Sequence, residues 1–438
     1  VVLIFAGDDR DDVLAEVARI EQSIFSSRTA DGRPMRCGVS IVFRQEGQTL
    51  PEPLTGHEHF GFLDGVSQPG LRGRTSETDP ASVLTPRQNP ANPNQGKPGQ
   101  DLIWPGEFVF GYPGQSREDV HAPGENSLFE NRQPVAPEWA QDGSYLVFRR
   151  LRQDVPGFRK FLEETAPEVE LTPALLGAKV VGRFPSGAPI TITGDLEEET
   201  PESHALGGDD CRNNAFEFGG KGKADGGESG AAEAEARGGV RGHEDAGPAA
   251  VAENAAGKAA GEKDCRCPAP EPVDPDTEGL RCPFAGHIRK TYPRDDEGTI
   301  SDELNEATTQ THRLLRRGIP FGPPYPLDPP PGHKDSGDRG LLFLAYQTSI
   351  VEQFEFVQRA WANNAGFKDT PDDKGPRSGH DLIIGQNPDG PREFVIPFAD
   401  GRREVIRTNE SWVIPTGGGY FFSPSIQALH GLASGAIR

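Results

Sequence analysis

The chain has 438 residues, of which 34% are hydrophobic and 26% are charged, as expected for a globular protein of two domains or one large domain with insertions. Its formal net charge of -22 argues against nucleic acid or an anionic membrane as a partner, because binding to phosphate needs the opposite sign. No apolar run approaches the length of a membrane span. The chain has a single Met and so offers few thioethers to oxidation. This favours an oxidising, extracellular setting, with a cytosolic one as the alternative.

The first part of the chain alternates strand and helix patterns. Residues 1–7 (VVLIFAG) and 37–47 (CGVSIVFRQEG) have the apolar character of strands, and residues 11–24 carry apolar side chains at helical spacing. No initiator Met or basic region stands before Val1, so we expect the chain to begin inside a longer precursor. A connection rich in Gly, Pro and Asn follows, with one short strand near residues 108–110.

Residues 143–165 predict a strand followed by a helix, with Pro156 near the helix start. Residues 219–283 contain no aromatic residue and predict a disordered insertion, because they cannot bury enough apolar surface to offset chain entropy. The sequence after residue 283 predicts a strand at 339–350 and a helix at 351–367, and it ends with the segment GGGYFFSPSIQALHGLA. We expect an α+β protein with one half on each side of the insertion.

His287 has the most informative surroundings of the ten histidines, since the apolar CPFAG precedes it and Arg289, Lys290 and Arg294 follow. A neutral imidazole beside cations suits a metal ligand next to an anionic cofactor. Haem fits this description, because its iron binds imidazole while its propionates attract arginines. The alternative is an ordinary surface histidine in a basic patch.

Two further segments carry residues suited to chemistry. In GFLDG, Asp64 is either part of an Asp-Gly turn or an acid held against an apolar pocket. In LLRRG, extended chain would point one of Arg316 and Arg317 inward, where a guanidinium can hold an anionic oxygen species, and leave the other in water. Leu341 and Phe343 share one face of their strand and either line a flat cofactor or fill the core.

The five cysteines form no even disulfide framework. Cys265 and Cys267 could bind zinc together with Cys282, although no second properly spaced pair exists. A serine hydrolase is not supported, because no G-x-S-x-G motif is present.

Four signatures together are similar to one family. GFLDG with Asp64, CPFAGHIRKTYPR with His287, LLRRGIPFG with Arg316 and the tail GGGYFFSPS resemble the dye-decolorising peroxidases, and the fungal branch in particular. The resemblance covers nearly all of the chain outside the insertion. It implies two ferredoxin-like α+β halves with antiparallel sheets and peripheral helices, of the dimeric α+β barrel type, with haem b bound between helices and sheet. Relatives carry strands ahead of the equivalent of Val1, so the first half is expected to lack its first strands.

The implied boundaries are an N-terminal half at 1–195, a connector at 196–218, the disordered insertion at 219–283 and a haem-binding half at 284–438. The implied reaction uses hydrogen peroxide to oxidise dyes, phenols and other aromatic donors in one-electron steps. His287 looks like the iron ligand, Asp64 the acid–base residue and Arg316 the arginine that stabilises O–O cleavage. The remaining implied roles are lining of the distal face for Leu341 and Phe343, propionate binding for Arg289 and Arg294, and orientation of His287 for Asp381.

Large dyes are not expected to enter such a closely lined site. We therefore expect surface aromatics to relay electrons, first Trp361 and behind it Tyr420, although Trp361 could equally cap a contact between helix and sheet. Two other functions compete with the peroxidase. One is a haem-binding or haem-handling protein with little turnover, and the other is a non-catalytic acidic interaction protein that binds no haem.

Overall fold

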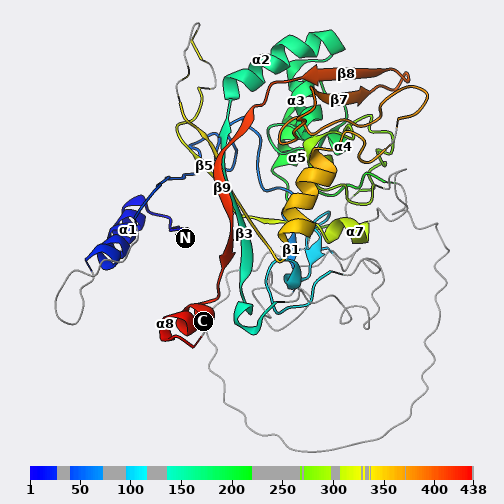
Figure 1. The fold of residues 1–438 in the computed structure, drawn as a ribbon. Helices are drawn as coiled ribbons and strands as arrows, with labels where there is room; N and C mark the ends of the chain where they lie inside the picture. Colours follow the sequence, from blue (N-terminus) through cyan, green and yellow to red (C-terminus); the bar gives the residue numbers. More distant parts are fainter. Residues whose placement is uncertain are drawn as a thin grey trace, which may run out of the picture.

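The computed structural model describes residues 1–26, 40–72, 95–115, 136–219, 267–268, 271–296, 306–326, 329–330, 335, 337–369 and 371–436. At its centre is a five-stranded antiparallel sheet in which β3 (Ser144–Gln153) lies between β6 (Gly340–Gln347) and β9 (Val413–Ser423) (Figure 1). Two short strands, β4 (Leu315–Arg316) and β5 (Ile319–Phe321), pair with opposite ends of β6. The sheet thus joins a strand from before the insertion to strands from after it.

The main core lies where two helices and a hairpin meet one end of the sheet. There α2 (Val155–Thr165) begins at Asp154, whose carboxylate caps the Gly157 N–H, and α3 (Pro173–Val181) begins at Thr172, which caps Leu175. The hairpin of β7 (Arg392–Pro397) and β8 (Arg403–Thr408) lies beside them (Figure 1). Their shared apolar cluster includes Phe158, Phe161, Leu176, Val180, Phe394, Ile396, Ile406 and Trp412.

Apart from the 16-residue α1, the other elements are short. The helices are α1 (Arg10–Phe25), α4 (Ile190–Thr193), α5 (Pro201–Gly207), α6 (His287–Thr291), α7 (Glu306–Gln310) and α8 (Ile426–Ser434). Single 3₁₀ turns lie at Pro105–Glu107, Glu138–Ala140 and Ala166–Val169, and π-helical turns at Ile350–Glu355 and Val357–Ala362. Strands β1 (Gly70–Leu71) and β2 (Leu102–Ile103) form a parallel pair. No helix among the described residues has the length and apolar content needed to cross a membrane.

The α+β class with antiparallel sheets is confirmed, and so are the strand and helix at 143–165 and the strand at 339–350. The helix predicted at 351–367 is present as two π-helical turns that end at Ala362, five residues earlier than predicted. Three predicted strands are wrong. Residues 1–7 and 40–47 form no strand, the first three residues of the predicted strand at 37–47 lie outside the described residues, and residues 108–110 follow a 3₁₀ turn. An apolar pattern becomes a strand only when a second strand satisfies its backbone groups, and these segments pair with no strand of the described chain. The helix α1 forms as predicted but buries none of its residues and stands apart from the sheet (Figure 1).

The prediction that residues 219–283 are a disordered insertion is wrong for the C-terminal end of that range. Residues 271–283 are described, and Asp276 and Cys282 within them are buried. Cys267 forms a disulfide with Cys211, 56 residues earlier, so this thiol is not a zinc ligand, and Cys282 is a free, buried cysteine. Most of the insertion, including Cys265, lies outside the described residues.

Candidate active site

The loop that carries Asp64 is closed on itself by hydrogen bonds. The Glu58 carboxylate accepts from the N–H groups of Phe60 at 2.8 Å and Phe62 at 2.9 Å, and the Asp64 N–H donates to the Gly56 carbonyl at 3.0 Å. Gly65 has φ +82°, so the predicted Asp-Gly turn is present. The turn directs the carboxylate out of the loop, where it accepts the Gly65 N–H at 2.6 Å and a hydrogen bond from Arg316 at 2.9 Å. The two interpretations of Asp64, as part of an Asp-Gly turn and as a candidate acid, are therefore compatible.

Arg316 reaches Asp64 from β4, 252 residues later in the chain. Gln68 fixes its backbone, because the Gln68 amide donates to the Arg316 carbonyl at 2.9 Å and accepts from the Arg316 N–H at 3.3 Å. Arg317 is exposed, as the alternation of extended chain predicts. Gln68 belongs to the same loop as Asp64, so a single loop places both members of the pair.

The ion pair decides the charge of Asp64. Partial burial would raise the pKa of its carboxyl group. The charge and hydrogen bond of Arg316, with the Gly65 N–H, outweigh that effect and hold the pKa below its usual value. Asp64 is therefore ionised at neutral pH and is poised to accept a proton.

His287 is the first residue of α6, and its ring is fixed from behind. Its Nδ1 donates to Asp381 Oδ2 at 2.7 Å, and the fully buried Asp381 also accepts the N–H groups of Ile383 at 2.7 Å and Ile384 at 3.1 Å. Burial would lower the pKa of His287, but the negative charge of Asp381 and its hydrogen bond raise it overall. With Nδ1 engaged, Nε2 is the ring nitrogen left for a ligand.

Asp64, Arg316 and His287 all line one cavity of about 250 Å³. Their side chains are 34%, 30% and 29% exposed, respectively, and the exposed part of each faces this space. Leu341 and Phe343 form part of its apolar wall. Six residues singled out from the sequence line this cavity: Asp64, His287, Arg294, Arg316, Leu341 and Phe343.

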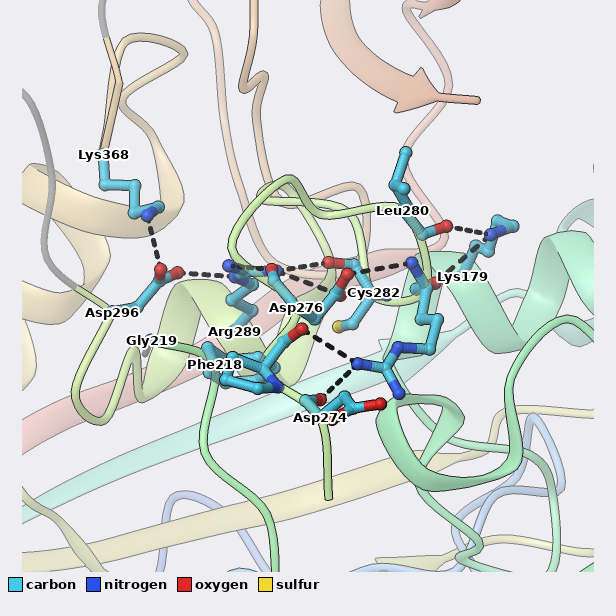
Figure 2. Close-up of polar contacts among 12 residues, drawn as sticks. Lys179, Phe218, Gly219, Asp274, Asp276, Leu280, Cys282, Arg289, Asp296 and Lys368 are labelled. Atoms are coloured by element: carbon cyan, nitrogen blue, oxygen red, sulfur yellow. Dashed lines mark hydrogen bonds and ion pairs between the residues drawn. The ribbon is translucent and has the colours of Figure 1, made fainter. Parts of the chain in front are cut away.

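Arg289 does not lie at the cavity, and its predicted role in binding a propionate is wrong. The side chain is 1% exposed and donates to Asp296 at 2.5 Å and to the Cys282 carbonyl at 2.7 Å, while Asp276 lies 3.3 Å away (Figure 2). Residues two apart on a helix point about 200° apart, so Arg289 faces away from His287 on α6. The charge of Arg289 is balanced by the buried carboxylates of Asp276 and Asp296.

Comparisons with known proteins identify relatives of this chain. Residues 286–373 match the family model described as Dyp-type peroxidase, C-terminal. The "Dye-decolorizing peroxidase" of Mycena epipterygia is 30% identical, with 99% of this chain aligned to 66% of that protein. A solved structure of an ancestral D-type dye-decolorizing peroxidase is 32% identical and superposes with a TM-score of 0.63, covering 97% of this chain and 72% of that one.

The chain belongs to the dye-decolorising peroxidase family. A crystal structure of the peroxidase from Auricularia auricula-judae is similar at 28% identity and a TM-score of 0.63, over 97% of this chain and 72% of that chain. The chain spans slightly less than two thirds of the length of the curated dye-decolorising peroxidases that it matches, 65% in the case of "Peroxidase 2" of Mycetinis scorodonius.

Dye-decolorising peroxidases are haem-dependent, and the cavity fits that cofactor. His287 offers one ring nitrogen, and Leu341 and Phe343 offer a flat apolar wall. Arg294 lies at the cavity, donating to Asn214 Oδ1 at 2.6 Å and to the Phe216 carbonyl at 2.8 Å. Arg183, which the sequence analysis missed, also lines it, and its buried Nε has no hydrogen-bond acceptor among the described residues. An acidic group of the cofactor would satisfy that donor.

The two aromatics expected to relay electrons lie outside the cavity. Trp361 is only 2% exposed, so its prediction as a surface aromatic is wrong; it stacks on Phe367 with ring centroids 5.4 Å apart. Its ring also meets His312, which lines the cavity, edge-on at 5.2 Å. Tyr420 is 44% exposed and contacts Phe354, another cavity residue, at 6.2 Å, so it does not stand behind Trp361.

Proposed function

We propose that the chain is a haem-dependent peroxidase that uses hydrogen peroxide to oxidise dyes, phenols and other aromatic donors in one-electron steps. The observation that carries this proposal is the shared cavity, in which the Asp64–Arg316 ion pair and His287 converge from three separate segments. An ionised carboxylate next to a guanidinium is suited to moving a proton within a polarised oxygen species.

Three residues would hold the cofactor. His287 would bind its iron through Nε2, and Arg183 and Arg294 would face its acidic groups. Bound haem supplies the iron at which the peroxide O–O bond is cleaved and the electrons that the donors later replace. Asp381 keeps the imidazole oriented and, as a buried anion, increases its basicity.

Asp64 and Arg316 would act on the peroxide. The Asp64 carboxylate takes a proton from one peroxide oxygen and returns it to the other, which leaves as water. Arg316 donates hydrogen bonds to the negative charge that builds up during cleavage, and it keeps Asp64 ionised between turnovers. Gln68 holds the two groups in register.

Two aromatic contacts support entry of electrons from donors too large for the cavity. Trp361 touches the cavity residue His312, and Tyr420 touches Phe354, which in turn lies 6.0 Å from Phe343. We keep both as relay candidates, Tyr420 as the exposed member.

The decisive experiment is a haem titration of the purified chain followed by peroxide and a dye. The expected result is a Soret band that saturates at one haem per chain, is lost in His287→Ala, and is accompanied by bleaching of the dye. A chain without a Soret band would be a non-catalytic protein. A band with no turnover, unchanged in Asp64→Asn, would indicate a haem-handling protein instead.

A further inference from the structure

A second cavity, of about 180 Å³, lies between the β7–β8 hairpin, the loop at 371–378 and the segment at 278–284. We call it the hairpin pocket, and it shares no lining residue with the candidate active site. Arg403 joins two of its walls, donating to both oxygens of Asp372 at 2.6 Å and 2.8 Å. Three segments distant in sequence thus form its walls.

The walls are cationic, although the chain as a whole carries a net charge of -22. Among the lining residues, one carboxylate, Glu278, stands against the four cations Lys374, Arg377, Arg402 and Arg403, and Asp369 and Asp372 contact Arg377 from outside the lining. Two of these are already neutralised, because Arg403 binds Asp372 and Arg402 donates to Glu170 at 2.8 Å. The other two therefore determine what the pocket can bind.

Lys374 has no ion-pair partner among the described residues, and the carboxylates around Arg377 all lie at 3.4 Å or more. The Lys374 ammonium has no acceptor among the described residues, and it reaches to within 3.3 Å of the position that a Cβ on Gly401 would occupy, at the hairpin turn. Arg377 has three carboxylates around it, all at long range, with oxygens at 3.4 Å on Glu278, 3.7 Å on Asp369 and 3.7 Å on Asp372. Its Nε is buried and has no hydrogen-bond acceptor in the described part of the chain. Both cations can accommodate a further anionic oxygen.

The pocket also has aromatic walls. Phe398 carries the Arg402 guanidinium over its ring at 4.4 Å, and Phe284 lies 5.7 Å from Arg377. An engineered protein cavity of about 150 Å³ lined by apolar side chains takes up benzene, so the hairpin pocket has room for one ring with a small substituent.

We infer that the hairpin pocket is a binding site for a monocyclic aromatic anion, with its ring against Phe284 and Phe398 and its acidic group on Lys374 and Arg377. Aromatic carboxylates and sulfonates both meet this description. The site is separate from the haem cavity, so the inference stands whether or not the chain is a peroxidase.

Calorimetric titration at low ionic strength with benzenesulfonate tests the inference. We expect one site with a dissociation constant at or below about 1 mM. Benzyl alcohol, which lacks the charge, and methanesulfonate, which lacks the ring, should each bind at least about tenfold more weakly, and added salt should weaken the benzenesulfonate complex. Equal affinity for all three compounds, or no saturation by about 10 mM, would overturn the inference.

Variants assign the binding to this pocket. Lys374→Met should weaken benzenesulfonate binding about fivefold and Arg377→Leu about tenfold, because the latter also removes a buried donor. Lys160→Met, at an exposed lysine on α2 that lies 3.8 Å from Glu164, is the matched control and should change nothing. Since Arg377 also contacts three carboxylates, Arg377→Lys checks that the fold survives. Unchanged affinity in both Lys374→Met and Arg377→Leu would place the ligand elsewhere and refute the assignment.

Discussion

At the scale of single residues, the site depends on a charge pair whose members are held by the same loop. Asp64 and Arg316 are close enough for a hydrogen bond, and Gln68 and Glu58 fix the backbone around them. Because Arg316 lowers the pKa of Asp64, the carboxylate is ready to accept a proton, and the arginine is ready to hold negative charge.

Removing either partner should therefore slow the step that uses peroxide. We expect Asp64→Asn to lower the peroxide-dependent rate by about 10²- to 10⁴-fold, the usual contribution of a general acid–base group. Arg316→Leu should lower it by about 10²- to 10³-fold through loss of charge stabilisation. Stopped-flow mixing of haem-loaded protein with peroxide measures both. Arg317→Leu, at the exposed neighbour, is the matched control, and an equal loss there would contradict the assignment.

Glu58 gives the protein a pH-dependent stability. Burial raises the pKa of its carboxyl group from 4.5 to about 7, against the opposing effect of the hydrogen bonds from Phe60, Phe62 and Gln153. Between these values the folded chain keeps a proton that the unfolded chain has released, so the free energy of unfolding falls as pH rises, by up to about 1.4 kcal/mol per pH unit.

The variant Glu58→Gln cannot titrate and should lose this part of the slope. Urea denaturation at several pH values from 4.5 to 7, on both proteins, measures the difference in slope. A variant with the same slope as the wild type would show that another group is responsible.

At the scale of elements, the five-residue helix α6 is held from two sides. His287 faces the cavity and is fixed by Asp381, while Arg289 and Lys290 are buried behind it. Lys290 donates to the Asn364 carbonyl at 2.8 Å and to the Phe367 carbonyl, and burial lowers its pKa to about 7. A helix this short is not stable alone, so its tertiary contacts set its position.

Asp381→Asn should weaken haem binding about 10- to 100-fold, since the amide no longer supplies the charge that orients the imidazole and raises its basicity. Absorbance titration with haem measures the affinity. Asp389→Asn, at an exposed position in the same segment, should leave it unchanged. Equal affinities for wild type and Asp381→Asn would remove Asp381 from the cofactor site.

The π-helical turn at Val357–Ala362 carries Trp361. Kinetics with two donors can distinguish a role of Trp361 in electron transfer from a role in packing. If electrons pass through this ring, Trp361→Phe should slow oxidation of a large dye about tenfold or more. Turnover of a small phenol should stay within about twofold. Each tenfold change in rate corresponds to about 1.36 kcal/mol in the activation free energy. Steady-state kinetics with the two donors give the ratio. Equal behaviour of both donors would leave Trp361 with only a packing role.

At the scale of the whole molecule, the Cys211–Cys267 disulfide joins residues on either side of the undescribed stretch at 220–266. Closing a loop of 56 residues reduces the entropy of the unfolded chain. Replacing both cysteines with serine should lower the free energy of unfolding by about 2–4 kcal/mol, measured by denaturant unfolding. The single variant Cys282→Ser provides a comparison that keeps the disulfide, and an unchanged double variant would contradict the prediction.

The sequence by itself determined several elements and, through a family resemblance, the candidates for the site. The elements β3, α2 and β6 follow from local periodicity, which depends on neighbouring residues alone, whereas Asp64, His287 and Arg316 are singled out because their short segments resemble one family. The contact between Asp381 and His287, 94 residues apart, is implied by the resemblance and is present in the tertiary structure, but only the tertiary structure decided that Cys211 bonds Cys267.

The tertiary structure also decided that Arg183 faces the cavity while Arg289 turns away from it, and that residues 1–7 form no strand. A side chain's direction and a strand's partner depend on what packs against them from far along the chain, and local sequence does not encode that.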